Sequence, residues 1–282
     1  MTMRFGDYRV EVIPDCEFRL DGGAMFGVVP RNLWARVTSP DEQNRIRMNM
    51  NCLFIEAGAE RILIDTGIGD KWSVKHRAMY AINRQRSLEE SLKSIAGVSA
   101  EEITTVINTH LHFDHAGGNT KFNAFGKAVP AFPNARYCVA RSEYEHAEAP
   151  TDRDRASYLS ENWRPMKESG QLELRDGDYQ VVPGLRMETH AGHNRSMQCA
   201  RLEHDGRTLF GFADLVPTRA HVPFAWVMGY GLYPVDTVEA KKKLIPQAAR
   251  ENWMCLFYHD PEIPLGRIVE EDGKFRSVAV EL

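Results

Sequence analysis

Short apolar runs recur along the chain, and longer stretches with a helical pattern separate them. The apolar runs are rich in β-branched and aromatic residues, a composition that favours strands. They predict strands at Tyr8–Ile13, Cys52–Ile55, Arg61–Ile64, Thr105–Ile107, Tyr137–Val139, Arg186–Glu188, Thr208–Phe212 and Cys255–Phe257. The intervening stretches predict helices at Ser87–Ile95, Ser142–Ala147, Arg153–Glu168 and Thr237–Asn252. Strands mixed with helices along the whole chain predict a layered α/β or α+β architecture.

The composition is that of a globular protein with a hydrophobic core. Hydrophobic residues make up 43% of the 282 residues and charged residues 26%. No linker or repeat divides the sequence, so we predict a single domain over residues 1–282. No apolar stretch is long enough for a signal peptide or a membrane span, which predicts a soluble, cytoplasmic protein without a membrane partner.

The net charge and the cysteine spacing each argue against a class of function. The net charge of −4 leaves no basic excess, which argues against a nucleic-acid partner. The one basic cluster, Lys241-Lys242-Lys243, is predicted to be a solvated helix face. Widely spaced cysteines without a CxxC pair predict reduced, buried thiols instead of disulfides or a catalytic nucleophile. These cysteines are Cys16, Cys52, Cys138, Cys199 and Cys255.

Several predicted strands end at a residue that can bind a metal ion. The run ERILI leads into Asp65, TVINT into His110, RTLFGFA into Asp214 and WMCLFY into His259. The strand in LRMETHAG leads through a short loop to His193. Strand ends that converge on one edge of a sheet provide a rigid base for a functional site.

One segment gathers four such residues. Residues 109–118 read Thr-His-Leu-His-Phe-Asp-His-Ala-Gly-Gly. Alternate residues of an extended chain share a face, so His110 and His112 can bind one ion from the same side. Asp114 and His115 are consecutive, so a turn directs them elsewhere, and the two following glycines supply the backbone freedom for it. Three histidines and an aspartate at these offsets are rare by chance, which favours metal ligands over structural histidines.

This segment resembles the defining motif of the metallo-β-lactamase superfamily, and the other strand ends match the remaining motifs in order. Asp65 in LIDTGIG resembles the first motif and His193 in HAGHNRS the third. Asp214 in FGFADL resembles the fourth and His259 in LFYHDP the last. The resemblance is closest in character to the lactonase and organophosphate-hydrolase branches. It implies an α+β fold, the four-layer αββα sandwich of that family, with the metals at one edge.

The resemblance also implies a binuclear metal centre and a role for each ligand. One ion would be held by His110, His112 and His193, the other by Asp114, His115 and His259, and Asp214 would bridge both. Asp65 would steady the histidine loop without binding metal. The ions would be two divalent transition metals, zinc in the first place, with iron, manganese or cobalt as alternatives. A shared hydroxide would attack the substrate, and Asp114 would also act catalytically as the proton acceptor.

A bridging aspartate is similar to that of lactonases, thioesterases and phosphodiesterases of the family, whereas the zinc β-lactamases lack one. We therefore predict a metal-dependent hydrolase of lactones or related carboxylic esters with apolar arms. A phosphotriesterase or phosphodiesterase and a glyoxalase II-like thioesterase are the alternatives among enzymes. A di-iron redox or binding module is the alternative outside hydrolysis. The partner would be a small-molecule substrate, and a homodimer is compatible with the resemblance.

Two aromatic segments broken by glycine and proline are candidates for a substrate pocket. They contribute Met25, Phe26, Phe224 and Trp226, for which core packing is the alternative interpretation. His221 is the nearest polar residue after Asp214. It is predicted either as a catalytic residue that contacts substrate or as a structural histidine.

Overall fold

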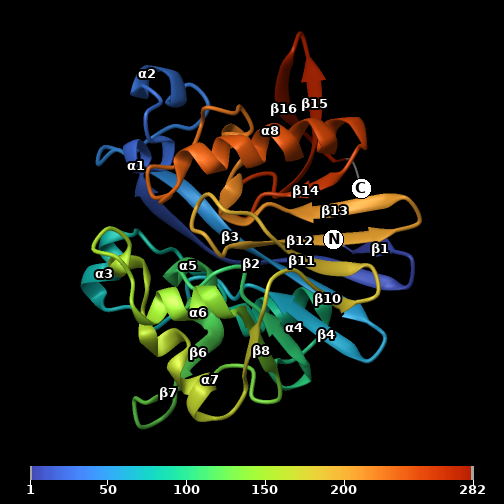
Figure 1. Cartoon of the computed structure of the whole chain (residues 1–282). Coiled ribbons are helices and arrows are strands. Elements are labelled where there is room, and N and C mark those ends of the chain that lie inside the picture. The colour runs from blue at the N-terminus through green and yellow to red at the C-terminus, as the bar shows by residue number, and fades with distance from the viewer. Residues whose placement is uncertain (1, 281–282) are drawn as a thin grey trace. The chain divides into compact units, whose positions relative to one another are not determined.

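The computed structural model describes residues 2–280 (Figure 1). They form two compact units. Unit 1 comprises the chain up to Cys16 together with Met50–Gly177. Unit 2 comprises Glu17–Asn49 together with the chain from Asp178 onward. The chain passes between the units within strand β2, within strand β3 and after Gly177. The single domain expected for residues 1–282 stays a prediction.

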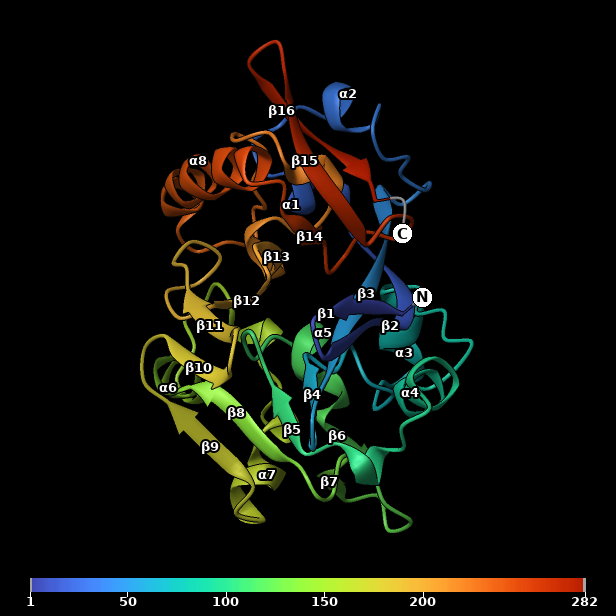
Figure 2. The ribbon, with the colours of Figure 1, turned by 90° about the vertical axis from the view of Figure 1, so that its right-hand side faces the viewer.

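The first seven-stranded sheet has the order β1-β2-β3-β4-β5-β8-β9. Its strands are β1 Met3–Phe5, β2 Tyr8–Asp21, β3 Arg45–Ala57, β4 Glu60–Ile64, β5 Thr105–Ile107, β8 Arg136–Ala140 and β9 Leu172–Arg175. The last four strands in this order run parallel, and Figure 2 shows β5, β8 and β9 side by side. Because the carboxyl ends of parallel strands meet at one edge, the segments that follow β4, β5 and β8 are brought together there.

Short helices and a two-stranded sheet complete unit 1. They are α3 Val74–Met79, α4 Leu88–Ala96, α5 Phe113–Ala116, α6 Arg141–Glu148, α7 Arg164–Glu168, the 3₁₀ turns η1 Ala100–Glu102, η2 Gly117–Asn119, η3 Arg155–Ser157 and η4 Ser160–Asn162, and strands β6 Thr120–Phe122 and β7 Ala128–Pro130. The helix predicted at Arg153–Glu168 is wrong, since η3, η4 and α7 stand in its place. Pro165 explains the break, because in one continuous helix its ring would clash with the carbonyl of Glu161.

The second seven-stranded sheet has the order β10-β11-β12-β13-β14-β15-β16 and lies in unit 2. Its strands are β10 Tyr179–Val182, β11 Leu185–Thr189, β12 Gln198–His204, β13 Arg207–Gly211, β14 Met254–Leu256, β15 Leu265–Glu271 and β16 Lys274–Ala279. Neighbouring strands are antiparallel except β13 and β14, which run parallel. The segments that carry Asp214 and His259 follow these two strands and so leave the sheet at the same edge.

Helix α8, Pro234–Arg250, connects β13 to β14 and packs beside β15 and β16 (Figures 1 and 2). The remaining helical segments of unit 2 are α1 Gly22–Phe26, α2 Arg31–Trp34, η5 Ala213–Leu215 and η6 Arg219–His221. The core beneath α8 is formed by Phe210, Phe212, Trp253 and Phe257 together with Ile245 of the helix itself. All eight predicted strands are present, and three of the four predicted helices are confirmed.

The prediction that Lys241, Lys242 and Lys243 form a solvated helix face is wrong for Lys241 on α8. Its side chain is buried, whereas Lys242 and Lys243 are exposed as predicted. The Lys241 Nζ donates hydrogen bonds to the carbonyl oxygens of His221 at 2.6 Å, Pro223 at 2.8 Å and Trp226 at 2.9 Å. Burial lowers the pKa of Lys241 to about 7, and three carbonyl acceptors match the three donors of an ammonium group.

The cysteine prediction is confirmed, since all five cysteines are free and buried. Burial raises the pKa of the Cys16 and Cys52 thiols, and the neighbouring Asp15 carboxylate adds to this effect. The thiols are therefore held in the protonated, unreactive form. Within residues 2–280, no helix combines the length and the apolar character needed to cross a membrane.

Candidate metal centre

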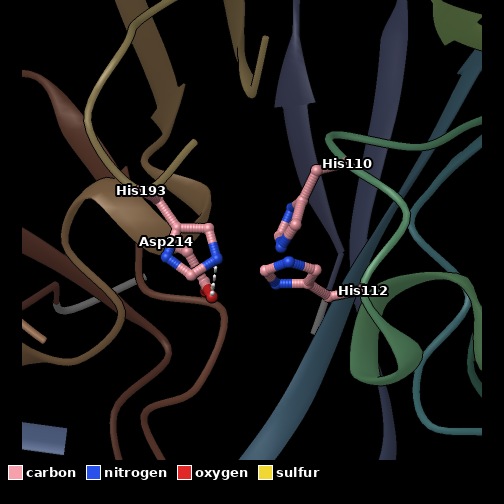
Figure 3. A group of neighbouring side chains, drawn as sticks. All are labelled: His110, His112, His193 and Asp214. Atoms are coloured by element: carbon pink, nitrogen blue, oxygen red, sulfur yellow. Dashed lines mark ion pairs between the residues drawn. The ribbon is translucent and has the colours of Figure 1, made fainter. Parts of the chain in front are cut away.

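The histidine loop of unit 1 follows β5 and ends in the short helix α5. His112 has an extended backbone, and Asp114 and His115 lie in the first turn of α5. Figure 3 shows the rings of His110 and His112 next to each other, with ring centroids 4.6 Å apart. The His110 and His115 rings are 4.1 Å apart. All four candidate ligands of this loop are buried, so their donor atoms are gathered out of bulk water.

Asp65 holds this loop from beneath, where the sequence predicts a supporting carboxylate. Its side chain accepts hydrogen bonds from the Thr109 backbone N–H and from the Thr109 hydroxyl, both at 2.8 Å. It also lies 2.8 Å from Nδ1 of His115, which therefore donates to the carboxylate. This contact fixes the orientation of the His115 ring. Asp65 adopts φ +58°, a strained backbone conformation that the surrounding contacts maintain.

The two glycines after the loop serve a different purpose from the one predicted. Gly117 has φ −60°, an ordinary helical value, so backbone freedom does not explain it. A Cβ atom at Gly117 would lie 2.2 Å from the carbonyl oxygen of Ile68. A Cβ atom at Gly118 would lie 2.1 Å from that of Thr66. Glycine is required because the backbones that carry Asp65 and the histidine loop approach each other closely.

Replacing Asp65 with asparagine should weaken metal binding or turnover about 10–100-fold while leaving the candidate ligands in place. The amide keeps the shape of the side chain, but it removes the charge that faces His115. Metal content, chelator competition and kcat of the purified variant measure the effect. Asp70→Asn, at an exposed position of the same segment, is the matched control. Unchanged affinity and turnover in Asp65→Asn would contradict the supporting role.

Other polar residues beneath the loop were missed by the sequence analysis. The Asn108 side chain donates to the carbonyl of His115 at 3.3 Å, and Asn119 donates to Asn108 at 2.8 Å. The Thr66 hydroxyl donates to the side-chain oxygen of Asn119 at 2.9 Å. A second buried carboxylate, Glu143, also contacts the loop. Asn108 and Asn119 flank the motif directly, but no spacing rule connects Glu143 to it.

Unit 2 brings the other three candidate ligands together. Nε2 of His193 lies 3.3 Å from Asp214 Oδ2, the ion pair drawn in Figure 3. Nε2 of His259 lies 3.0 Å from the other carboxylate oxygen of Asp214. The His259 Nδ1 donates to the carbonyl of Asn49 at 3.1 Å, which directs Nε2 toward Asp214. All three side chains are buried, and Asp214 offers one oxygen to each imidazole.

His221 lies seven residues after Asp214 and is fully buried. Its Nε2 donates to the carbonyl of Met25 at 2.8 Å, and its Nδ1 accepts from the Thr218 hydroxyl at 2.7 Å. Burial lowers the pKa of His221 to about 3, and the Lys241 charge acts in the same direction. A neutral ring with both nitrogens hydrogen-bonded within the protein favours the structural role over the catalytic one.

The four residues predicted to line a substrate pocket lie mostly in the core of unit 2. Met25 and Phe26 are fully buried, and Phe26 stacks on His221 with ring centroids 4.5 Å apart. Trp226 packs edge-on against Phe26 at 5.6 Å, and the half-buried Phe224 packs against the core. Phe26 also reaches a pocket of about 610 Å³ in unit 2. Its lining combines apolar residues such as Val37 and Ile46 with charged ones: Arg19, Arg47, Arg219, Arg276, Asp260 and Glu262.

An aromatic pocket of about 460 Å³ lies in unit 1 instead. Trp72, Tyr80 and Tyr158 line it together with polar residues that include Lys71 and Glu161. The Trp72 and Tyr80 rings each lie 5.3 Å from the ring of Phe113, the residue between His112 and Asp114. Burial raises the pKa of Tyr80, and the Asp114 charge adds to this. The pocket therefore borders the histidine loop, although its residues are too far apart in sequence to form a pattern.

Comparison with known proteins agrees with this geometry. A family model described as the metallo-beta-lactamase superfamily matches residues 46–259. An N-acyl homoserine lactonase of Bacillus thuringiensis is 28% identical over 227 residues, covering 75% of this chain and 81% of that protein. The crystal structure of a probable metal-dependent hydrolase from Staphylococcus aureus superposes with a TM-score of 0.90 at 28% identity, covering 99% of both chains.

A more distant structure shares the fold. The dizinc quorum-quenching lactonase AidC, in complex with a product N-hexanoyl-L-homoserine, superposes with a TM-score of 0.79 at 18% identity. The match covers 100% of this chain and 97% of that one. These similarities confirm the predicted α+β fold class.

Proposed function

The chain belongs to the metallo-beta-lactamase superfamily and is a metal-dependent hydrolase, and from this premise we propose that it hydrolyses lactones or related esters with apolar arms. The observation that carries the proposal is the buried histidine loop beside an aromatic pocket in unit 1. The names of the lactonase relatives support a lactone as the reacting group. N-acyl homoserine lactones are therefore the first substrates to test.

We propose that seven residues hold two divalent transition-metal ions, with zinc first and iron, manganese or cobalt as alternatives. They are His110, His112, Asp114, His115, His193, Asp214 and His259, divided between the two ions as the family resemblance implies. Their donor chemistry fits, because imidazole nitrogens and carboxylate oxygens are the ligands that zinc and its neighbours prefer. Histidines that bind metal commonly donate their other ring nitrogen to a carboxylate or carbonyl oxygen. His115 does so to Asp65 and His259 to the carbonyl of Asn49.

When bound, such ions lower the pKa of water toward neutrality and polarise the carbonyl oxygen of an ester. We propose that Asp114 takes up the proton released during hydrolysis, because it is a buried carboxylate within the loop itself. Phe113, Trp72 and Tyr80 would exclude bulk water around Asp114. Exclusion of water strengthens the interaction of Asp114 with the reacting groups.

The aromatic pocket would receive the apolar arm of the substrate. Apolar contact contributes roughly 25 cal/mol per Å² of buried area, or up to about 0.8 kcal/mol per CH₂ group. The side chains of Trp72, Tyr80 and Tyr158 offer such apolar contact next to the histidine loop. The positions predicted from sequence, Phe26 and Trp226, pack against each other instead.

The value of kcat/KM should rise about tenfold or more as the acyl chain of the lactone lengthens from four to eight carbons. Trp72→Ala should flatten this rise without removing metal, because the substitution shortens the pocket wall. Initial rates with a series of N-acyl homoserine lactones measure both effects. Trp226→Ala is the comparison, and it should preserve the chain-length preference.

Two results would count against this substrate class. Equal hydrolysis rates for lactones with short and long acyl chains would contradict the proposed role of the aromatic pocket. A marked preference for phosphotriesters or anionic phosphodiesters, with metal still bound, would favour the phosphoesterase alternative.

A further inference from the structure

Glu143 on α6 is a fully buried carboxylate outside the predicted ligand set. Its helix begins directly after β8, at the carboxyl edge of the parallel strands of unit 1. Ser142 and Glu145 on the same helix are exposed, whereas Glu143 lies on the buried face together with Tyr144 and Ala147. A buried carboxylate is strongly disfavoured unless hydrogen bonds compensate for the lost water. The hydrogen bonds that compensate for the burial of Glu143 therefore indicate its role.

Those contacts lead to the histidine loop. Glu143 Oε1 accepts a hydrogen bond from the backbone N–H of Leu111 at 2.8 Å. Leu111 lies between His110 and His112, so this bond fixes the peptide that separates two candidate ligands. The same oxygen accepts a hydrogen bond from the hydroxyl of Tyr158 at 3.0 Å. Asp65 contacts neither of these groups, because it binds Thr109 and His115.

Tyr158 in turn packs against His112. Its ring lies 4.7 Å from the His112 ring at an interplanar angle of 69°, and the backbones of the two residues form a β-bridge. Two further rings contact Tyr158, that of His146 at 5.5 Å and that of Trp163 at 6.3 Å. Nε2 of His146 is 2.6 Å from Asp154, which also accepts from the Thr151 hydroxyl at 2.6 Å. Tyr158 is thus held on both sides and limits the orientations available to His112.

We propose that Glu143 and Tyr158 are positioning residues for His112, a second support of the metal site that is independent of the Asp65 support of His115. The inference rests on the proposed function, since it requires His112 to be a metal ligand. Loss of the support lets the loop between His110 and His112 sample other orientations. The affinity for the ion that His112 binds then falls, and the ligands themselves are unchanged.

The test compares zinc affinity in full-length variants by competition with a chromophoric chelator. Glu143→Ala removes the acceptor and should weaken the binding of one zinc ion about 10–100-fold. Glu143→Gln keeps an oxygen that can accept both hydrogen bonds, so its affinity should remain within about threefold of wild type. Glu145→Ala, at the exposed position two residues along α6, is the matched control and should bind zinc as wild type does.

Tyr158→Phe provides a second, milder test, because it removes a single hydroxyl and retains the ring against His112. It should also weaken zinc binding, and it decides the matter if Glu143→Ala does not fold. If Glu143→Ala folds and binds zinc with wild-type affinity, the inference is overturned and the proposed function stays intact. If Glu143→Ala does not fold, wild-type affinity in Tyr158→Phe overturns the inference in the same way. A wild-type chain that binds no zinc or other divalent transition metal overturns both.

Discussion

Asp214→Ala should lower kcat/KM by about a thousandfold, a loss of about 4 kcal/mol of transition-state stabilisation. The wild-type chain should contain close to two transition-metal ions, and the variant clearly fewer. The reason is the position of Asp214, which faces His193 with one carboxylate oxygen and His259 with the other. Removing it leaves both imidazoles without the group between them. Elemental analysis and lactone hydrolysis on the same preparations measure the two losses together.

Asp236→Ala is the control for this experiment, because that aspartate is exposed on the first turn of α8. Its metal content and activity should equal those of the wild-type chain. Metal-free wild-type protein with full activity would contradict the entire ligand assignment. Full metal content in Asp214→Ala would contradict the bridging role in particular.

Lys241→Met should lower the free energy of unfolding by about 3 kcal/mol. The methionine fills much of the space of the lysine stem, but it leaves the carbonyl groups of His221 and Trp226 without a donor, whereas that of Pro223 still accepts from the Trp226 N–H. Each unsatisfied buried acceptor costs roughly 1–3 kcal/mol. Methionine also avoids the free-energy cost of burying a charged group, which offsets part of this total. Equilibrium urea denaturation of the metal-loaded proteins measures the change, which corresponds to a fall in Tm of about 6–12 °C.

Lys242→Met is the matched control on the next residue of α8. Lys242 is exposed and pairs with Glu239 on the same helix face, an interaction worth a few tenths of a kcal/mol. Its unfolding free energy should stay within about 0.5 kcal/mol of wild type. Equal stability of the two methionine variants would show that the three carbonyl contacts of Lys241 do not stabilise the fold.

The local elements could be predicted from the sequence because their signals are local. The strand predicted at Thr105–Ile107 has those bounds in the structure, and the helix predicted at Ser87–Ile95 is displaced by one residue. The one helix prediction that is wrong conflicts with a second local signal in the same stretch. Pro165 within the stretch predicted as one long helix is the example, since proline disfavours a helix interior.

Burial was harder to predict, because it depends on which face of an element meets a neighbour. Lys241, Lys242 and Lys243 are chemically identical, yet only the first points into unit 2 beneath the segment that follows η6. Phe26 and Trp226 are aromatic residues in glycine-rich stretches, a composition that fits a pocket wall and a packed core equally well. Stacking of Phe26 between Trp34 and His221 is a property of the assembled unit alone.

The sequence by itself determined the strands, the fold family and the identity of the candidate ligands. Short offsets within residues 109–118 and positions directly after strands are local signals that the sequence carries, and the family resemblance implied the remaining candidate ligands and the fold. Only the tertiary structure showed the contact of Glu143 with the loop and located the aromatic pocket. Glu143 reaches Leu111 across 32 residues, and the pocket joins Trp72 to Tyr158. Contacts at such separations are decided by how strands and helices pack, and side-chain identity alone does not encode which of many distant residues will meet.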